Sequence, residues 1–523
     1  MLPKPINTLP PRLRRTRGGC EGCRDRHIRC DRGLPGCNQC AKRGTECLGY
    51  EKQYRWVWGP SVRALDATVK ELDADRESVH QRDSRAVATC NARDGINPNR
   101  VQSRTDGVPS LPMTTQVASI PASLSTSDQE LSEDCRQNYF LDYYFGSIAS
   151  VISIKEGPNN QFGESLKQYM SRSHALRFTI VAMAAMLVAD SKVDSSAVGH
   201  AWHYRTMALG MLQKDILQQS YSIEILATVL FLGTTEFWFD AKSSGSVHLN
   251  AAKQLLLHNI NSGVQVPLFL ANFLCWFETM SSFVSDDEGL VFSSPATYVS
   301  LNAGGNTARG DYDTIFDPLV GNWGTLMPLV GRVGTIVRKL RKGTELAELD
   351  ELIDTAEIDL LEWEHSDPPL NTHDRPTPSD TSCAQEFYSI AETYRLSALL
   401  ALYNYSPRLL IKRATLVTDV KTAAEFLSQL ACSTIALLRQ IPIDSRLWFV
   451  CSIPILSAGQ LMTKSCDREF LRSVLSMLMK RTRLTAAEKV SQLLEDVWER
   501  RDAGSEIWWM DILDETGNPM LIN

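Results

Sequence analysis

Six cysteines crowd into one short stretch near the beginning of this 523-residue chain. They are separated in turn by two, six, six, two and six residues, and they are Cys20, Cys23, Cys30, Cys37, Cys40 and Cys47. Zinc in structural sites is tetrahedral and takes thiolate ligands, and a gap of two residues lets a pair of cysteines bind one ion. The spacing therefore predicts that this segment is built around zinc.

The number of cysteines indicates how many ions are bound. Two tetrahedral zinc ions need eight metal–ligand bonds, and six thiolates supply them only when two of the sulfurs bridge both ions. We therefore predict a binuclear cluster with two Zn²⁺ per chain. Three disulfides in a secreted module and a zinc module that binds protein are the alternatives. The odd total of 13 cysteines, the lack of an apolar signal segment and the basic surroundings argue against them.

The run CEGCRDRHIRC from Cys20 to Cys30, followed by Pro35 and the remaining cysteines, resembles the fungal Zn2Cys6 binuclear-cluster transcription factors. The resemblance implies that Pro35 lies in the loop between the two halves of the cluster. It also implies that the first short helix enters the major groove of double-stranded DNA and reads a CGG-type triplet. The implied ligand set has Cys20 and Cys37 bridging, Cys23 and Cys30 completing one ion, and Cys40 and Cys47 completing the other.

Basic side chains between and around the cysteines are the candidates for contacting DNA. Arg26 lies between two expected ligands and can form a bidentate contact with guanine, the commonest specific contact in the major groove. His27 stands where many relatives have Lys or Arg, and a neutral imidazole donates a single hydrogen bond to a base edge. The candidates for phosphate contacts, which position the protein without specifying sequence, are Arg24, Arg29, Lys42, Arg43, Arg14, Arg15 and Arg17.

The excess of basic residues lies at the start of the chain, where the cysteines are clustered. Residues 1–58 hold 13 Lys and Arg against 5 Asp and Glu, whereas residues 59–523 hold 41 and 56, so a head of net charge +8 precedes a body of −15. A basic segment favours binding to a polyanion, and the acidic body would repel one. The overall net charge of −7 therefore does not exclude a nucleic-acid partner.

Four predicted segments position these residues, namely an arm, a zinc domain, a linker and a helical domain. We predict a flexible basic arm at 1–17, which is either a nuclear import signal or an extension that binds phosphate, and a zinc domain at 18–50. The stretch 59–138 has no Phe, Trp or Tyr, so we predict a disordered linker over 51–135. Apolar residues spaced as alternate a and d positions within 61–82 indicate either a short coiled coil that makes a homodimer or a lone amphipathic helix.

The rest of the chain, 136–523, shows helical periodicity and hardly any alternation, which predicts a large all-α regulatory domain and a mainly α protein. The expected helices cover 175–190, 201–218, 224–239, 268–283, 326–340, 384–403, 419–439 and 485–501. The apolar run at 178–189 is too short to span a membrane. The order of these features is similar to that of the second fungal-specific transcription factor domain, which implies a helical region that controls activation.

Features of the body that could carry chemistry are few. It lacks the nucleophile elbow, metalloprotease, phosphate-loop and dinucleotide motifs. His200 and His203 could share a metal one helical turn apart, although an ordinary polar helix face explains them equally. The segment 506–515 mixes acidic and bulky apolar residues, as in either an activation segment or an amphipathic helix docked on the core.

Together these features predict a nuclear, sequence-specific DNA-binding transcription factor that regulates RNA polymerase II genes. Its partners would be CGG-type DNA half-sites and the transcription machinery or co-regulators, with no membrane contact. Regulation of one pathway, including a biosynthetic gene cluster, is the role that the resemblance favours. The competing hypothesis is an enzyme fused to a zinc module.

Overall fold

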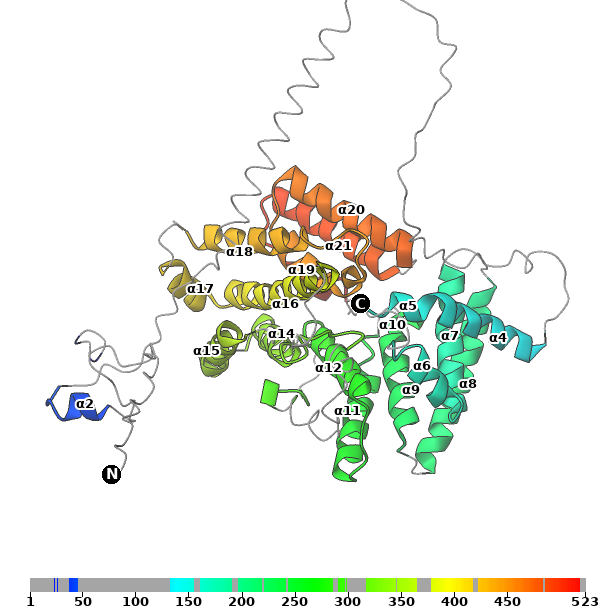
Figure 1. Ribbon diagram of the computed structural model, residues 1–523. Helices are drawn as coiled ribbons and strands as arrows, with labels where there is room; N and C mark the ends of the chain where they lie inside the picture. Colours follow the sequence, from blue (N-terminus) through cyan, green and yellow to red (C-terminus); the bar gives the residue numbers. More distant parts are fainter. Residues whose placement is uncertain are drawn as a thin grey trace, which may run out of the picture. The chain divides into compact units, whose positions relative to one another are not determined.

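The computed structural model divides the chain into two compact units, Met1–Ala88 and Thr89–Asn523. It describes the following residues: 23, 26, 37–45, 132–154, 160–190, 196–218, 221–240, 243–285, 290–296, 298, 317–344, 346–364, 378–416, 422–482 and 485–517 (Figure 1). The predicted basic arm, the helix expected at 61–82 and most of the predicted linker lie outside these residues.

The regular elements among the described residues of the second unit are all helices. Its first half contains α4 (Glu133–Tyr143), η2 (Tyr144–Ile148), α5 (Ala149–Val151), α6 (Glu164–Met170), α7 (His174–Asp190), α8 (Ala197–Leu217), α9 (Ile223–Thr234), α10 (Glu236–Phe239), α11 (Ser246–Asn261) and α12 (Leu268–Ser282). The prediction of a mainly α protein is confirmed.

The second half of this unit continues in the same manner. It contains α14 (Met327–Arg341), α15 (Leu346–Glu362), α16 (Pro378–Tyr405), α17 (Pro407–Ala414), α18 (Ala423–Leu438), η5 (Arg446–Val450), α19 (Ser452–Gly459), α20 (Ser465–Thr482), α21 (Thr485–Asp502) and α22 (Trp509–Thr516). Among the described residues, no helix is both long and apolar enough to cross a membrane.

The apolar helices are covered by other helices on more than one side. α7 packs against α4, α6, α8 and α9, and α8 and α9 run beside it (Figure 1). Every residue of α12 from Phe269 to Ser282 is buried. In the second half, α16 contacts α14, α15, α17, α18 and α19, so this 28-residue helix organises the packing of its neighbours.

One predicted helix is interrupted. The sequence indicates a continuous helix at 224–239, but α9 ends at Thr234 and α10 begins at Glu236. The hydroxyls of Thr234 and Thr235 donate to the carbonyl oxygens of Leu230 and Phe231, at 3.0 and 2.7 Å. Such local hydrogen bonds compete with regular helix geometry. Two adjacent threonines therefore mark the break that apolar periodicity alone did not indicate.

The other expected helices are present with shifted ends. The segment 485–501 corresponds to α21, 268–283 to α12 and 326–340 to α14, each within two residues. The helix expected at 384–403 is longer and extends over Pro378–Tyr405. α4 begins at Glu133, within the last residues assigned to the predicted linker, because the Ser132 hydroxyl caps it by accepting from the backbone N–H of Cys135.

Candidate metal centre and DNA-binding surface

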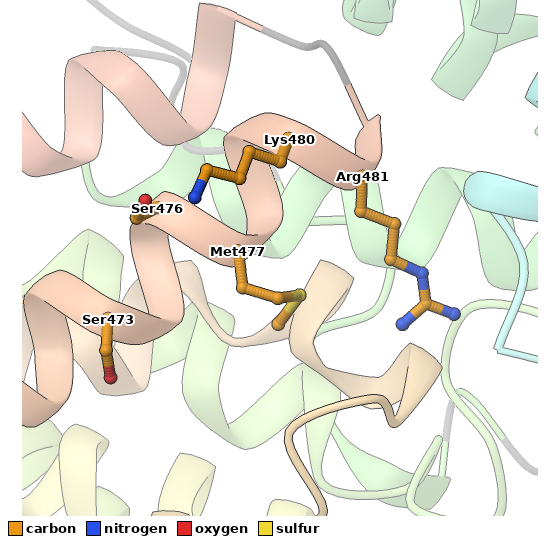
Figure 2. Close-up of a pocket in the computed structure, with 5 residues that line it drawn as sticks. All are labelled: Ser473, Ser476, Met477, Lys480 and Arg481. Atoms are coloured by element: carbon orange, nitrogen blue, oxygen red, sulfur yellow. The ribbon is translucent and has the colours of Figure 1, made fainter. Parts of the chain in front are cut away.

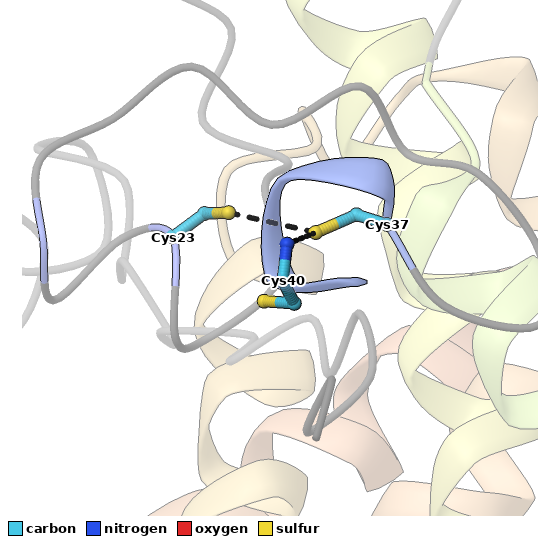
Figure 3. Close-up of side chains that lie close together, drawn as sticks. All are labelled: Cys23, Cys37 and Cys40. Atoms are coloured by element: carbon cyan, nitrogen blue, oxygen red, sulfur yellow. Dashed lines mark hydrogen bonds between the residues drawn. The ribbon is translucent and has the colours of Figure 1, made fainter. Parts of the chain in front are cut away.

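Three of the six clustered cysteines are described, and their sulfurs lie together. The sulfur of Cys37 is 3.6 Å from that of Cys23 and accepts a hydrogen bond from the backbone N–H of Cys40 at 3.3 Å (Figure 3). All three sulfurs lie within 4.8 Å of one another, and each cysteine is at most 2% exposed. Cys37 is therefore the member that connects the other two.

The short helix α2 (Asn38–Ala41) positions two of these cysteines. Cys37 is its N-cap and Cys40 lies in its first turn, so the two-residue spacing places both sulfurs on one side of the turn. The helix ends in a turn where Gly44 has a φ of +66°, a conformation that favours glycine, and Thr45 N–H returns to the carbonyl oxygen of Cys40 at 3.2 Å. The segment from Cys37 to Thr45, here called the ligand turn, is thus held by hydrogen bonds at both ends.

This arrangement fits zinc. Two thiolates on a tetrahedral zinc with bonds of about 2.3 Å lie about 3.8 Å apart, and the sulfurs of Cys23 and Cys37 are 3.6 Å apart. None of the three described cysteines of the cluster is in a disulfide. When bound, zinc would hold the two halves of the segment together in a module too small for an apolar core. Cys20, Cys30 and Cys47 lie outside the described residues.

Arg26 lies on the surface of this unit. Its Nη1 donates to the hydroxyl of Thr45 at 3.3 Å, and that hydroxyl donates to the carbonyl oxygen of Cys40 at 3.4 Å. Arg26 is therefore connected through Thr45 to the ligand turn. Thr45 was not among the predicted site residues, although a hydroxyl residue directly after Gly44 and two residues before Cys47 is a signal present in the sequence.

The other candidate DNA contacts are only partly described. Lys42 and Arg43 are exposed in the turn that follows α2. Both lie within three residues of Thr45 along the chain. The remaining candidates lie outside the described residues, namely His27, Arg24, Arg29, Arg14, Arg15 and Arg17.

The second unit has a surface hollow of about 560 Å³ over α20. Its lining side chains all project from this helix, and they are Ser473, Ser476, Met477, Lys480 and Arg481 (Figure 2). No histidine, cysteine or carboxylate lines it among the described residues, and the hydroxyl of Ser473 donates to the carbonyl oxygen of Phe470 at 2.6 Å. Arg481 donates to the carbonyl oxygens of Asp444 and Ser445. This hollow does not resemble a catalytic site.

The histidine pair on α8 has no third metal-ligating side chain grouped with it among the described residues. The rings of His200 and His203 both lie beside the ring of Tyr204, at 6.5 and 5.4 Å between centroids. The cysteines of the first unit are the only described residues that group as metal ligands. The polar helix face remains the interpretation of this pair.

The acidic and aromatic segment at the C-terminal end is docked on the core. Trp508, Trp509 and Ile512 are each at most 3% exposed. Asp511 and Asp514 pair with guanidinium groups of α14, and the hydroxyl of Tyr405 donates to Asp511 at 3.1 Å. Of the two interpretations of 506–515, the structure shows the docked amphipathic helix.

Comparison with known proteins gives matches in both units. Residues 18–56 match the fungal Zn(2)-Cys(6) binuclear cluster domain, and residues 139–522 match the fungal-specific transcription factor domain. The chain is also similar to the fumonisin cluster-specific transcription factor FUM21 of Gibberella moniliformis, with 29% identity over 150 residues. That match covers 28% of this chain and 21% of the relative. No solved structure matches.

These matches confirm the resemblance to both domain families that was stated from the sequence. The longer match spans most of the second unit, and the shorter one spans the cysteine cluster. The chain belongs to the family defined by the fungal-specific transcription factor domain, and it carries that domain after an N-terminal Zn2Cys6 DNA-binding domain.

Proposed function

We propose that this protein is a nuclear, sequence-specific DNA-binding regulator of RNA polymerase II genes that binds two zinc ions per chain. The observation that carries the proposal is the group of buried sulfurs around Cys37. A cysteine whose sulfur approaches ligands of both halves is what a bridging thiolate requires, and the cysteine count requires two bridges. Cys20 is the second bridge in this proposal, and Cys30 and Cys47 complete the two sites.

The zinc-bound segment would present its basic side chains to DNA as a fixed surface. Arg26 is the proposed base reader because a guanidinium matches the two acceptors of guanine. Its hydrogen bond to Thr45 links its position to the ligand turn of Cys40. Lys42 and Arg43 are exposed beside this turn and are proposed to contact phosphates, as are Arg24, Arg29 and the arginines of the arm at 14, 15 and 17. His27 is the second candidate for a base contact.

The DNA target and the regulated genes follow from the family and the relative. We propose CGG-type half-sites, read by one chain or by a homodimer formed through 61–82, and recruitment of co-regulators by the helical domain. The relative is named for the control of one gene cluster. By analogy, we propose that this chain regulates a single pathway, with a biosynthetic gene cluster as the leading candidate.

Selection of binding sites from random duplex DNA with the full chain tests this function. The proposal expects enrichment of one or two CGG-type triplets, with a fixed spacing if a dimer binds. The Cys23→Ser variant should lose this enrichment, whereas Cys135→Ser should retain it because Cys135 is exposed and lies outside the cluster. Selection that enriches no sequence, or that is equal for Cys23→Ser and the unchanged chain, would reject sequence-specific binding by the zinc domain.

A further inference from the structure

The α8 helix exposes a stripe of large apolar side chains. Its members are separated in turn by four, seven and seven positions, and they are Val198, Trp202, Leu209 and Ile216. Positions spaced in this way lie on one side of a helix, so these side chains, here called the α8 stripe, extend along most of α8. Each is between 37% and 46% exposed. The helix packs mainly on α7 (Figure 1), and the α8 stripe remains accessible to solvent beside that contact.

Most of the α8 stripe lies along a stretch of helix that exposes no acidic or lysine side chain. From Val198 to Gln213 the helix has no Asp, Glu or Lys, and its one arginine, Arg205, is buried and pairs with Glu236. Residues 59–523 carry a net charge of −15, so two copies of the chain repel each other in most orientations. Two copies can meet at the α8 stripe without burying an unpaired charge there.

Two glycines border the α8 stripe, Gly199 in the first turn of α8 and Gly210 in its interior. A Cβ added at either position would meet no atom of the described residues within 4 Å beyond its chain neighbours and the local helix backbone. Gly233 of α9 differs, because a Cβ there would lie 2.7 Å from the ring of Phe277. Glycine destabilises a helix interior relative to alanine, and it suits positions that another backbone approaches closely. Packing within the described domain does not account for Gly210, whereas close approach of a second helix does.

Trp202 is held in position by its neighbours within the domain. Its ring packs edge-on against Phe239 of α10, with 5.2 Å between the ring centroids. The guanidinium of Arg205 lies over the same phenylalanine ring, 4.6 Å from its centroid. Tryptophan often contributes much of the binding free energy at an interface. Because Trp202 is already placed and α8 is already folded on α7, a partner at this face would have to order little of the chain.

We propose that the α8 stripe is the contact surface for a second copy of this chain, with α8 packed against α8. Apolar residues repeated every seven positions are the pattern with which identical helices pair. Large side chains and glycines alternate on the same face, so a two-fold interface can set the side chains of one copy against the gaps of the other. The proposal does not depend on zinc, on DNA binding or on the dimer proposed through 61–82.

The length of the contact indicates its strength. A helix of 21 residues is about 30 Å long, which is short for an interface of the standard size of about 800 Å² on each partner. We therefore expect a reversible dimer with a dissociation constant on the order of micromolar.

Sedimentation equilibrium of the full chain without DNA tests this pairing. The measurement uses a chain that carries Leu65→Asp and Leu72→Asp, here called the reference chain, because these changes remove the apolar pattern of 61–82 and with it the other proposed dimer. We expect the reference chain to show a monomer–dimer equilibrium between about 1 and 100 µM.

Two matched variants of the reference chain locate the contact. Leu209→Glu places a carboxylate in the interface and should weaken dimerisation about tenfold or more. Leu352 of α15 is an exposed leucine outside the α8 stripe, so Leu352→Glu should leave the dissociation constant unchanged.

Gly210→Leu separates pairing from the stability of the monomer. Leucine has a higher helix propensity than glycine, so unfolding of this variant at about 1 µM, where the monomer predominates, should require more urea than unfolding of the reference chain. The added side chain blocks a second helix and should weaken dimerisation about tenfold or more. A glycine that served only the fold of the monomer would not give these opposite effects.

Three results would overturn the proposal. One is a reference chain that remains monomeric over the whole concentration range. Another is the same dissociation constant for Leu209→Glu and Leu352→Glu, which would place the contact elsewhere. The third is a folded Gly210→Leu variant that dimerises as the reference chain does, which would reject close packing of α8 against α8. If Leu209→Glu fails to fold, Gly210→Leu still tests the contact.

Discussion

Arg26 and Lys42 are both basic and exposed, and their different surroundings are the reason that we propose different roles for them. Arg26 donates to Thr45, whose hydroxyl donates to the backbone of Cys40, a proposed zinc ligand. Lys42 is a point charge in the turn after α2, where a flexible ammonium suits a phosphate. A guanidinium held against the ligand turn can be aimed at one base, whereas a flexible ammonium adapts to any backbone.

We expect Arg26→Ala to cost about 1–3 kcal/mol of binding free energy on the selected site and much less on random DNA. Lys42→Ala should weaken binding to both DNAs by a similar factor, because phosphates carry no sequence information. Titration of each variant with the selected and the random duplex measures both effects. An equal loss on the two duplexes for Arg26→Ala would contradict its role in reading bases.

Glu278 provides a test of the helical domain at the residue scale. Burial raises the pKa of its carboxyl, against the opposing effects of Lys253, whose Nζ is 3.3 Å away, and of the backbone N–H groups of Val291 and Phe292. The folded chain therefore holds this proton to higher pH than the unfolded chain. The stability contributed by this group is fully present below pH 4.5 and is lost as the pH rises through the folded pKa.

Urea unfolding between pH 4.5 and 7.5 tests this sign. The free energy of unfolding of the unchanged chain, minus that of Glu278→Gln, should fall as the pH rises. Glu495→Gln is the control with the opposite sign when the series is extended down to pH 3, since a hydrogen bond from Arg472 lowers the pKa of Glu495 and that contribution is lost as the pH falls below 4.5. A difference for Glu278→Gln that grows with pH would contradict the raised pKa.

How far the sequence predicts the site depends on the residue. The spacing alone predicted that the six cysteines form one binuclear cluster, and the structure brings together the sulfurs of the three that it describes, Cys23, Cys37 and Cys40. The link from Arg26 to Thr45 was not predicted, because it joins residues 19 apart through a turn whose geometry depends on Gly44. Motif spacing indicates which groups can bind a metal, but it does not indicate which side chains hydrogen bond across the folded segment.

At the scale of elements, α15, α16 and α17 meet around a buried ion pair. The carboxylate of Glu357 is 2.6 Å from Nη2 of Arg413, and the hydroxyl of Tyr403 donates to it at 2.8 Å. Both charged side chains are at most 5% exposed. A second pair joins α15 to α17 at the surface, where Arg408 contacts Asp354 at 2.9 Å with both side chains more than 40% exposed.

These two pairs join the same helices and should respond differently to removal of the acid. Glu357→Ala leaves the Arg413 guanidinium buried without its partner and should cost about 3–5 kcal/mol of unfolding free energy. Asp354→Ala removes an exposed partner and should cost less than about 1 kcal/mol. Urea unfolding of both variants measures the contrast. Similar losses for the two would show that burial of Glu357 does not control the effect.

Helices were easier to predict than their contacts. Apolar periodicity located α7 and α21, and the threonine and glutamate spacing at the start of 485–501 agrees with the first residue of α21. The break between α9 and α10 was missed because the hydrogen bonds of Thr234 and Thr235 are local, whereas periodicity averages over several turns. The pair of Glu357 and Arg413 joins residues 56 apart, which a periodic pattern within one helix cannot indicate.

For the whole molecule, the division of charge follows the two matched domains. The +8 head contains the cysteine cluster, and the −15 remainder contains the helical domain. Contacts with phosphate release counterions, so DNA affinity should fall steeply with salt. Because the acidic body repels DNA, the DNA affinity of the whole chain should depend on the fold of the head, and therefore on its metal.

The most direct test of this account is the zinc content of the purified full chain. It would be measured by elemental mass spectrometry on the same samples that are used for DNA binding. We expect two zinc ions per chain. The Cys37→Ser variant should lose both zinc and DNA binding, because a bridging thiolate serves both ions. The Cys135→Ser variant should keep the zinc content and the DNA binding of the unchanged chain. A strong chelator should also abolish DNA binding by the unchanged chain. One zinc or none per chain, or DNA binding that survives the chelator, would contradict the account.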